Sequence, residues 1–125
     1  MDEVGIAIFK YCYYPYFKRS SKMEGSIQFK AKVFRALSDP ARLEILEFLR
    51  GGEKCVCEIV AHMGIIQPVV SRHLKILKDC GLVNDRKEVN RRFYSITSLK
   101  ICEIIDCITP ELIDALLKHA IEQII

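Results

Sequence analysis

The spacing of hydrophobic residues along the chain predicts four consecutive helices. Apolar side chains recur every three or four positions over 26–37, 40–50, 55–63 and 68–80, which is the period of a helix with one buried face. The third helix is short and ends at Gly64, and the fourth is longer, so this pair is predicted to form a helix-turn-helix. The expected inward-facing residues are Ile27, Ala31, Phe34, Leu37, Leu43, Leu46, Leu49, Val70, Leu74 and Leu77.

Residues typical of helix ends stand between these segments. We expect Asp39 to cap the second helix, because Pro40 after it suits a first helical position. Gly51 and Gly52 are expected to end that helix, and Gly81 is expected to end the fourth. The helical pattern is therefore divided into short, capped units.

The hydrophobic pattern changes to alternation after the fourth helix. Residues 82–87 and 91–96 predict two strands of a hairpin. Its tight turn requires a positive φ, which we expect at Asn90, because the β-branched Val89 tolerates that conformation poorly. The predicted fold is mostly α with a small β-hairpin wing, a winged helix-turn-helix.

Two more helical segments follow the hairpin. They are separated at Thr109 and Pro110, where a cap and a first helical position predict a break. A single small domain has no remaining core for the apolar surface of these segments, so we expect a homodimer through the terminal helices. The alternative is an intramolecular lid over the wing. The apolar residues concerned are Ile101, Ile104, Ile105, Ile108, Leu112, Leu116, Leu117, Ile121, Ile124 and Ile125.

The chain divides into three expected parts. These are an N-terminal arm (1–25), a winged-helix DNA-binding domain (26–97) and C-terminal dimerisation helices (98–125). Aromatic residues crowd around Cys12 in the arm, which either packs on a partner or precedes the true start, because Met23 opens a plausible domain by itself. No apolar run reaches the roughly 18 residues that a membrane span needs, and no convincing signal peptide is present, so we expect a cytoplasmic protein.

Charge is distributed unevenly, although the net charge is only +3. Residues 67–97 hold seven Lys and Arg against three Asp and Glu, whereas residues 98–125 hold two against five. A basic centre followed by an acidic, apolar tail suggests one segment for a polyanion and another for a protein partner. The alternative is that the basic stretch is only a solvated face.

Several short motifs follow one another in this order of elements. They are ALSDPARLEIL (36–46), CVCEI (55–59), VSRHLK (70–75), GLV (81–83), Arg86-Lys87 and YSI (94–96). With these motifs the chain resembles the ArsR/SmtB family of winged-helix repressors over roughly residues 26 to 100. The resemblance implies a homodimeric repressor that leaves its DNA operator when a metal or another inducer binds.

Double-stranded DNA is the expected partner of the fourth helix and the wing. Residues early in the second helix of a helix-turn-helix face base edges, where Arg can bind guanine and Gln can bind adenine. By position these are Gln67, Ser71, Arg72 and Lys75, with His73 either beside them or in a half-buried packing role. On the wing, we expect Arg86, Lys87, Arg91 and Arg92 to contact phosphate or the minor groove. A dimer would place two such helices on an inverted repeat.

Cys55 and Cys57 are the candidate sensor. The start of a helix stabilises a thiolate and lowers the pKa of a cysteine there. Side chains two residues apart on a regular helix diverge, so an ion that binds both sulfurs would loosen the first turn of the third helix. This would strain the third helix, which supports the fourth, DNA-reading helix (the reading helix). Thiolates select arsenite, antimonite, cadmium or lead, with Cys12 as a third ligand. The alternative is two cysteines that act as small buried hydrophobes.

Six cysteines leave further alternatives open. Without an export signal, reduced thiols are favoured over a disulfide framework. Cys102 or Cys107 could face Cys55 or Cys57 across the fold, and the resemblance implies that joining such a pair would make a redox or persulfide-sensing repressor of the same fold. A second alternative is a winged helix used only for protein–protein contact. No cofactor is required, and no nucleophile–base–carboxylate set is apparent, so we do not expect an enzyme.

Overall fold

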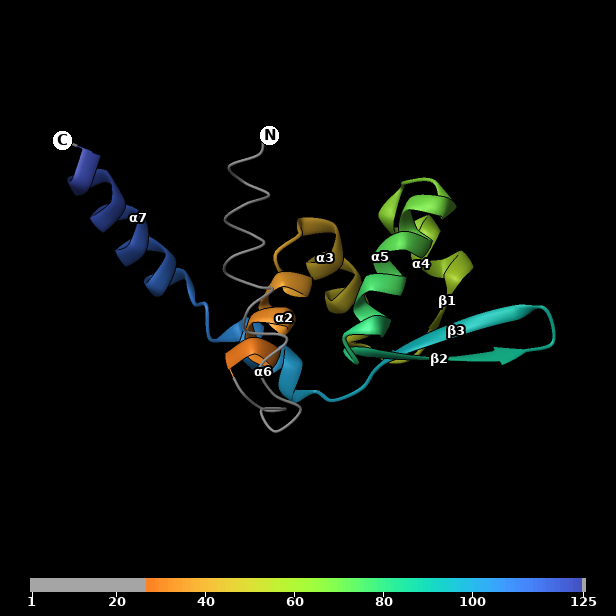
Figure 1. Ribbon diagram of the computed structural model, residues 1–125. Coiled ribbons are helices and arrows are strands. Elements are labelled where there is room, and N and C mark those ends of the chain that lie inside the picture. The colour runs from red at the N-terminus through yellow and green to blue at the C-terminus, as the bar shows by residue number, and fades with distance from the viewer. Residues whose placement is uncertain (1–26, 125) are drawn as a thin grey trace, which may run out of the picture.

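The computed structural model describes residues 27–124 as six helices and three strands (Figure 1). The expectations for the arm, including Cys12, lie outside the described residues. No helix in the described range is both long and apolar enough to cross a membrane. The elements are α2 (Ile27–Leu37), α3 (Pro40–Leu49), β1 (Lys54–Cys55), α4 (Val56–Met63), α5 (Gln67–Asp79), β2 (Val83–Glu88), β3 (Arg91–Ile96), α6 (Lys100–Asp106) and α7 (Pro110–Ile124).

The predicted helix ends are confirmed at three places. The Asp39 carboxylate accepts hydrogen bonds from the N–H groups of Ala41 at 2.8 Å and Arg42 at 3.3 Å, as an N-cap does. Gly64 ends α4 with φ 67°, and Gly81 follows α5 with φ 77°. These left-handed conformations favour glycine and turn the chain sharply, first into α5 and then into β2.

The wing is part of a three-stranded antiparallel sheet with the order β1-β3-β2, not the two-stranded hairpin that the sequence predicts. Cys55 is extended, with φ −78° and ψ 158°, and does not begin the helix. Lys54 and Cys55 pair with Tyr94 and Phe93 of β3. The prediction missed β1 because a strand of two residues has no hydrophobic period and forms only through pairing with β3.

The turn of the wing differs from the prediction. Glu88 pairs with Arg91, so the loop has only Val89 and Asn90 as central residues. Positive φ occurs at Val89 (φ 55°), and the expectation that Asn90 adopts it is wrong. A positive φ at the first central position alone is the pattern of a type II′ turn, which the right-handed twist of a hairpin favours. Val89 is 85% exposed, so no packing compensates for this conformation.

The core lies between α3, α4, α5 and the sheet. Burial confirms most of the predicted inward positions, namely Leu37, Leu46, Leu49, Val70, Leu74 and Leu77. The prediction is wrong for Ile27, Ala31, Phe34 and Leu43, which are exposed, and Ile45 is buried in place of Leu43. For the three α2 residues the reason is that this helix buries only Ala36 and Leu37, at its C-terminal end, and leaves the apolar face of its earlier turns exposed.

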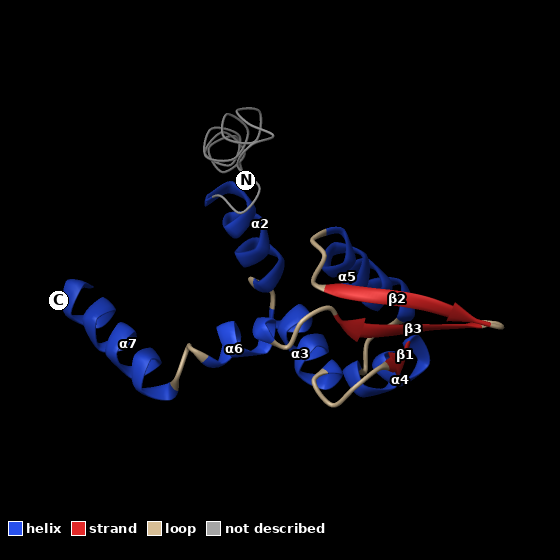
Figure 2. Ribbon diagram, turned by 90° about the horizontal axis from the view of Figure 1, so that it is seen from below, coloured by secondary structure: helices blue, strands red, loops and turns tan. Residues whose placement is uncertain are grey.

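The terminal helices confirm the predicted break and exclude the alternative of an intramolecular lid over the wing. The N–H of Leu112 donates to Oγ1 of Thr109 at 3.2 Å, and Pro110 opens α7. In both ribbon views α7 projects away from the body, at the opposite end from the wing (Figures 1 and 2). None of its described residues is buried, so the alternative of a lid over the wing is wrong.

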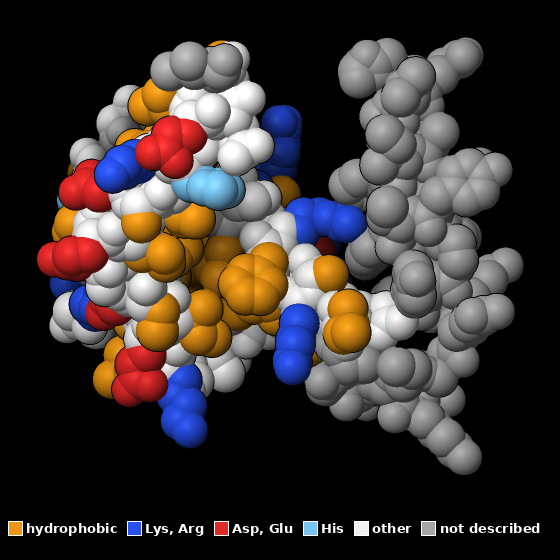
Figure 3. Space-filling view, turned by 90° about the vertical axis from the view of Figure 1, so that its left-hand side faces the viewer, with side chains coloured by type: hydrophobic (Ala, Val, Ile, Leu, Met, Phe, Trp, Pro, Cys, Tyr) orange, Lys and Arg blue, Asp and Glu red, His pale blue; other side chains and the backbone are white. Residues whose placement is uncertain are grey.

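Apolar side chains are therefore left uncovered on the side of the molecule that carries α7. Figure 3 looks at this side and shows hydrophobic side chains gathered in the middle of the face, with charged ones around them. A large exposed apolar surface marks an interaction site in a soluble chain. The α7 residues that contribute are Leu112, Ile113, Leu116, Leu117, Ile121 and Ile124.

Candidate nucleic-acid interface and thiol pair

Helix α5 places the expected DNA-reading residues on its outer face. Val70, Leu74 and Leu77 are completely buried and fix the rotation of the helix. The opposite face then carries exposed Gln67, Ser71, Arg72 and Lys75. Lys75 is bound to Asp79 at 3.0 Å, whereas Arg72 forms no ion pair with any described residue. Among these residues Arg72 is thus the cation that remains available for a base or phosphate.

His73 is half-buried and is held by Arg42, a residue that the sequence reading did not single out. Nη1 of Arg42 lies 3.3 Å from Nδ1 of His73. Because a guanidinium can only donate, Nδ1 accepts, and the proton of the neutral imidazole is on Nε2. Arg42 also donates to the carbonyl oxygens of Ala36 at 2.6 Å and Arg35 at 3.3 Å. It therefore ties the end of α2 to the reading helix.

The position of Arg42 also affects the cap of α3. Burial raises the pKa of the Asp39 carboxyl, but hydrogen bonds from the N–H groups of Ala41 and Arg42 and the charge of Arg42 outweigh it, so this pKa lies below its usual value. The signal in the sequence was an arginine in the first turn of α3, directly before the apolar residue Leu43. With 12% of its side chain exposed, Arg42 is a structural cation and not a surface one.

Arg86 is held within the wing. Its guanidinium donates to both carboxylate oxygens of Glu53, at 2.8 and 2.7 Å, and to Glu88 at 2.8 Å. It also lies over the Phe93 ring, 4.5 Å from the centroid. Hydrogen bonds to Glu53 and Glu88 raise the pKa of Arg86, and the bond to Arg86 lowers the pKa of Glu53. Glu53 precedes β1, so this pair fixes β2 to the start of the thiol segment.

The remaining wing cations fall into two kinds. Arg92 pairs with Asp85, and Lys78 of α5 binds the same carboxylate at 3.0 Å. The hydrogen bond from Lys78, followed by that from Arg92, lowers the pKa of Asp85. In contrast, Lys87 and Arg91 are exposed and have no ion pair among residues 27–124. These two cations can bind phosphate without first breaking an internal ion pair.

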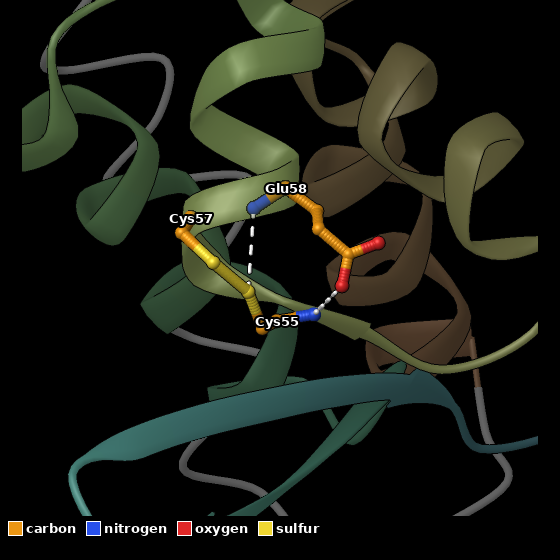
Figure 4. The surroundings of a disulfide bond; sticks show 3 residues. All are labelled: Cys55, Cys57 and Glu58. Atoms are coloured by element: carbon orange, nitrogen blue, oxygen red, sulfur yellow. Dashed lines mark hydrogen bonds between the residues drawn. A yellow bond between two sulfur atoms is a disulfide. The ribbon is translucent and has the colours of Figure 1, made fainter.

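Cys55 and Cys57 form a disulfide at the start of α4 (Figure 4). Sγ of Cys55 accepts the N–H of Glu58 at 3.4 Å, and the Glu58 carboxylate accepts the N–H of Cys55 at 3.3 Å, which makes a capping box. Cys55 is buried, whereas Cys57 is exposed. The sequence favours reduced thiols, whereas the structure joins Cys55 and Cys57 in a disulfide.

The disulfide also corrects the expected geometry of the thiol pair. The expectation that the first turn must loosen before both sulfurs can meet is wrong. Cys55 has the extended N-cap conformation and lies outside the helix, so its side chain is not constrained to diverge from that of Cys57. The Cα atoms are 5.4 Å apart, and the first turn of α4 stays intact. Cys55 belongs to the sheet and Cys57 to the helix.

A hollow of about 570 Å³ brings the thiol pair and the reading surface together. The start of α5 forms one wall and the tip of the wing another, with the disulfide between them. It unites residues that the sequence placed in separate DNA-binding and sensing groups. The lining residues are Cys55, Val56, Cys57, Val60, Gln67, Ser71, Asn90, Arg91, Arg92 and Tyr94.

The other cysteines of the described range are not joined to one another. Cys80 is partly buried, Cys102 is buried in α6 and Cys107 is exposed at the end of that helix. No group of three or more His, Cys, Asp or Glu side chains that could hold a metal ion occurs among residues 27–124. Cys55 and Cys57 thus supply two soft donors, and a third donor would have to come from elsewhere, as expected of Cys12.

Comparison with known proteins identifies the same elements. Residues 39–85 match the family described as bacterial regulatory protein, arsR family. The chain is 43% identical over 75 residues to a probable mercury resistance operon repressor of Streptomyces lividans, a match that spans 60% of each chain. It is 40% identical over 73 residues to an arsenical resistance operon repressor of Staphylococcus aureus, which spans 58% of this chain and 70% of the relative.

A solved structure extends the similarity to the fold. The homodimeric winged helix-turn-helix DNA-binding domain of a possible ArsR-family regulator from Mycobacterium bovis aligns with a TM-score of 0.66 and 29% identity, over 82% of this chain and 94% of that one. Fold and relatives define the class as DNA-binding transcriptional repressors of the winged helix-turn-helix type, and not enzymes. Within this class, the chain belongs to the ArsR family.

Proposed function

We propose that this protein is a homodimeric repressor that binds an inverted-repeat operator and leaves it when a thiophilic metal(loid) binds Cys55 and Cys57. The hollow carries this proposal, because Cys55 and Cys57 line the same hollow as Gln67 and Ser71 of the reading helix and Arg91 of the wing. An ion bound by the two sulfurs would therefore occupy the space between groups that would face DNA. The repressor would act in the cytoplasm, where its operator is.

DNA recognition in this proposal uses two sets of residues. Gln67, Ser71 and Arg72 would read base edges from α5, since these side chains are exposed on its outer face. Lys87 and Arg91 would bind phosphates first, because neither forms an ion pair with another residue of the 27–124 range. The remaining proposed contacts, which come from paired or half-buried side chains, are His73, Lys75, Arg86 and Arg92.

The link between the thiol pair and DNA release follows from the elements that carry the two sulfurs. Cys55 is paired with Phe93 in the sheet, so a displacement at Cys55 reaches β3 of the wing directly. Cys57 lies in α4, which packs against α5. An ion bound to both thiolates would fix the position of the wing relative to the reading helix. The wing and the reading helix must fit the same stretch of duplex, so a small change in their separation would weaken DNA binding.

The inducer proposed is arsenite, antimonite, cadmium or lead. Thiolates are soft donors that select such ions. The arsenical and mercury resistance repressors among the relatives support this class of inducer. Three-coordinate ions would take a third sulfur, for which Cys12 is the candidate on this chain.

The test is a titration of reduced full-length protein on a fluorescent fragment of its own upstream region. We expect arsenite, cadmium or lead to weaken binding by about tenfold or more, a usual size for coupling between two sites. Cys55→Ser and Cys57→Ser should abolish this response, and Cys80→Ser is the matched control, because Cys80 lies outside the hollow. Release by persulfide alone, abolished in Cys102→Ser or Cys107→Ser, would instead establish the redox alternative.

A further inference from the structure

We propose that the hollow is also a thiol–disulfide exchange site, at which a small anionic disulfide oxidises Cys55 and Cys57. The resulting disulfide form keeps its DNA-reading surface but no longer takes a metal(loid). The loss of metal(loid) binding in the disulfide form rests on the proposed function, whereas the thiol–disulfide exchange does not. The joined sulfurs, their unequal exposure and the charge of the surrounding walls support this proposal.

The two sulfurs are suited to different steps. Cys57 is exposed, so its thiolate can attack a disulfide that enters from solvent. Cys55 is 2% exposed and is reached only from within the protein. Its sulfur accepts the N–H of Glu58 at 3.4 Å, a contact that stabilises a thiolate at the start of a helix. Cys57 is thus the attacking cysteine and Cys55 the resolving one.

The reaction balances without a further reactant. The Cys57 thiolate attacks one sulfur of the small disulfide RSSR, its S–S bond breaks and one RS⁻ leaves, which gives a mixed disulfide on Cys57. The Cys55 thiolate then attacks Sγ of Cys57, and the second RS⁻ leaves. The two protons of the starting thiols end on the two RS⁻ groups. Cys55 and Cys57 are oxidised, and RSSR is reduced to two RSH.

The walls of the hollow favour an anionic reactant. No acidic side chain is among the lining residues, whereas Arg91 and Arg92 both are. Arg92 is neutralised by Asp85, but Arg91 has no ion pair in the described part of the chain. Gln67, Ser71 and Asn90 add neutral polar groups on the other sides. A disulfide with carboxylate groups therefore meets the positive charge of Arg91 in the same hollow as the attacking sulfur.

The disulfide form of the protein retains what DNA binding needs. With the two sulfurs joined, α5 still exposes Gln67, Ser71 and Arg72, and the wing still exposes Arg91. The bond consumes both thiolates, however, and only thiolates bind a soft ion. Oxidation would therefore leave the repressor on its operator and make it insensitive to the inducer.

The exchange is tested on the reduced full chain with two disulfides of different charge. Oxidised glutathione is the anionic probe and 2-hydroxyethyl disulfide the neutral one, and intact mass is followed with time. We expect a transient adduct of one RS group on Cys57, then loss of RSH as the Cys55–Cys57 bond forms, which leaves the chain two hydrogen atoms lighter than the reduced protein. Cys55→Ser should stop at the adduct, and Cys57→Ser should form neither product at this pair. A lasting adduct on Cys57 of the parent chain, located by peptide mapping, would overturn the proposal.

Charge variants test the choice of reactant. Arg91→Ala should slow oxidation by glutathione disulfide about fivefold, which is the effect of one unit charge at close range in water. It should not change the rate with the neutral disulfide. Lys87→Ala removes an equally unpaired cation of the wing outside the hollow, and we expect it to match the parent with both reagents. If Arg91→Ala and Lys87→Ala slowed oxidation by glutathione disulfide equally, the charge in the hollow would not select the reactant, and this part of the proposal would be overturned.

The final comparison separates this inference from the proposed function. Oxidised and reduced proteins are bound to the same upstream fragment and titrated with arsenite. We expect release of the reduced protein only, and restored release after a reductant. If arsenite does not release the reduced protein, the proposed inducer fails while the exchange data stand. If both forms are released equally, or the oxidised form does not bind DNA, the inference fails and the proposed function stands.

Discussion

Nη1 of Arg42 lies 3.3 Å from Nδ1 of His73, so the first turn of α3 holds the reading helix directly. Arg42 makes this contact while its Nε donates to the carbonyl oxygen of Ala36, the buried residue near the end of α2. Three helices therefore meet at one guanidinium. The orientation of the reading helix depends on a residue that would not itself touch DNA.

We expect Arg42→Ala to lower the free energy of unfolding by about 1 to 3 kcal/mol, because carbonyl oxygens near the end of α2 lose a charged donor. Urea denaturation measures this loss. His73→Ala is the control, since it removes only the contact to α5 and should cost less. Equal losses in the two variants would mean that the carbonyl contacts contribute nothing.

Arg72→Ala is expected to cost about 1 to 3 kcal/mol of specific DNA binding, through loss of a base or phosphate contact. Anisotropy titrations at moderate salt measure the change. Lys75→Ala is the matched control on the same helix, and it should cost less because Lys75 is already bound to Asp79 at 3.0 Å. Unchanged operator affinity in Arg72→Ala would remove its proposed role.

The salt dependence of DNA binding should distinguish the wing arginines. Loss of one phosphate-binding cation lowers the slope of log affinity against log salt by about one unit. We expect this change for Arg91→Ala, because Arg91 has no ion pair within the part of the chain that the structure describes. We expect a much smaller change for Arg86→Ala, because the Arg86 guanidinium is held by Glu53 and Glu88. Slopes that fall equally would show that DNA displaces both carboxylates from Arg86.

Val89→Asn is expected to raise the stability of the fold by about 1 kcal/mol, because asparagine tolerates the left-handed conformation better than a β-branched residue. The φ of Val89 is 55°, and the side chain is 85% exposed, so the substitution removes little packing. The shift in thermal midpoint measures it. Asn90→Gly is the control and should bring no gain, since Asn90 has no positive φ.

Stability should fall in acid, in part through Asp85. Hydrogen bonds from Lys78 and Arg92 lower the pKa of this carboxyl in the folded state. A lowered pKa adds stability that is fully present above the unfolded value of about 3.9 and is lost as the pH falls through the folded value. Urea midpoints between pH 7 and pH 3 measure this loss. Asp85→Asn should be less stable at pH 7 and show a shallower decline, and parallel curves would contradict the assignment.

Local patterns in the sequence predicted the reading helix well. The burial of Val70, Leu74 and Leu77 follows from helical periodicity, and the Asp39 cap follows from the residues next to it. These features depend on near neighbours along the chain, and the structure has them as predicted. The same applies to the break at Thr109.

Other features depend on contacts that no local pattern contains. Strand β1 forms only because β3 lies beside it, and its extended backbone then lets the sulfur of Cys55 reach that of Cys57. The sequence likewise predicts the same DNA-contacting role for Arg86 and Arg91, although in the structure Glu53 binds Arg86 and not Arg91. The hollow could not be foreseen, because three separate segments form its walls.

The uncovered apolar face of α7 ties the folded state to the amount of protein present. A single copy leaves Leu116, Leu117 and Ile121 more than half exposed, so a second copy that covers them stabilises both by mass action. The apparent melting temperature should therefore rise with total concentration. For a dimeric repressor, such a dependence would set a threshold: below a certain number of molecules per cell, copies would unfold before they could occupy DNA.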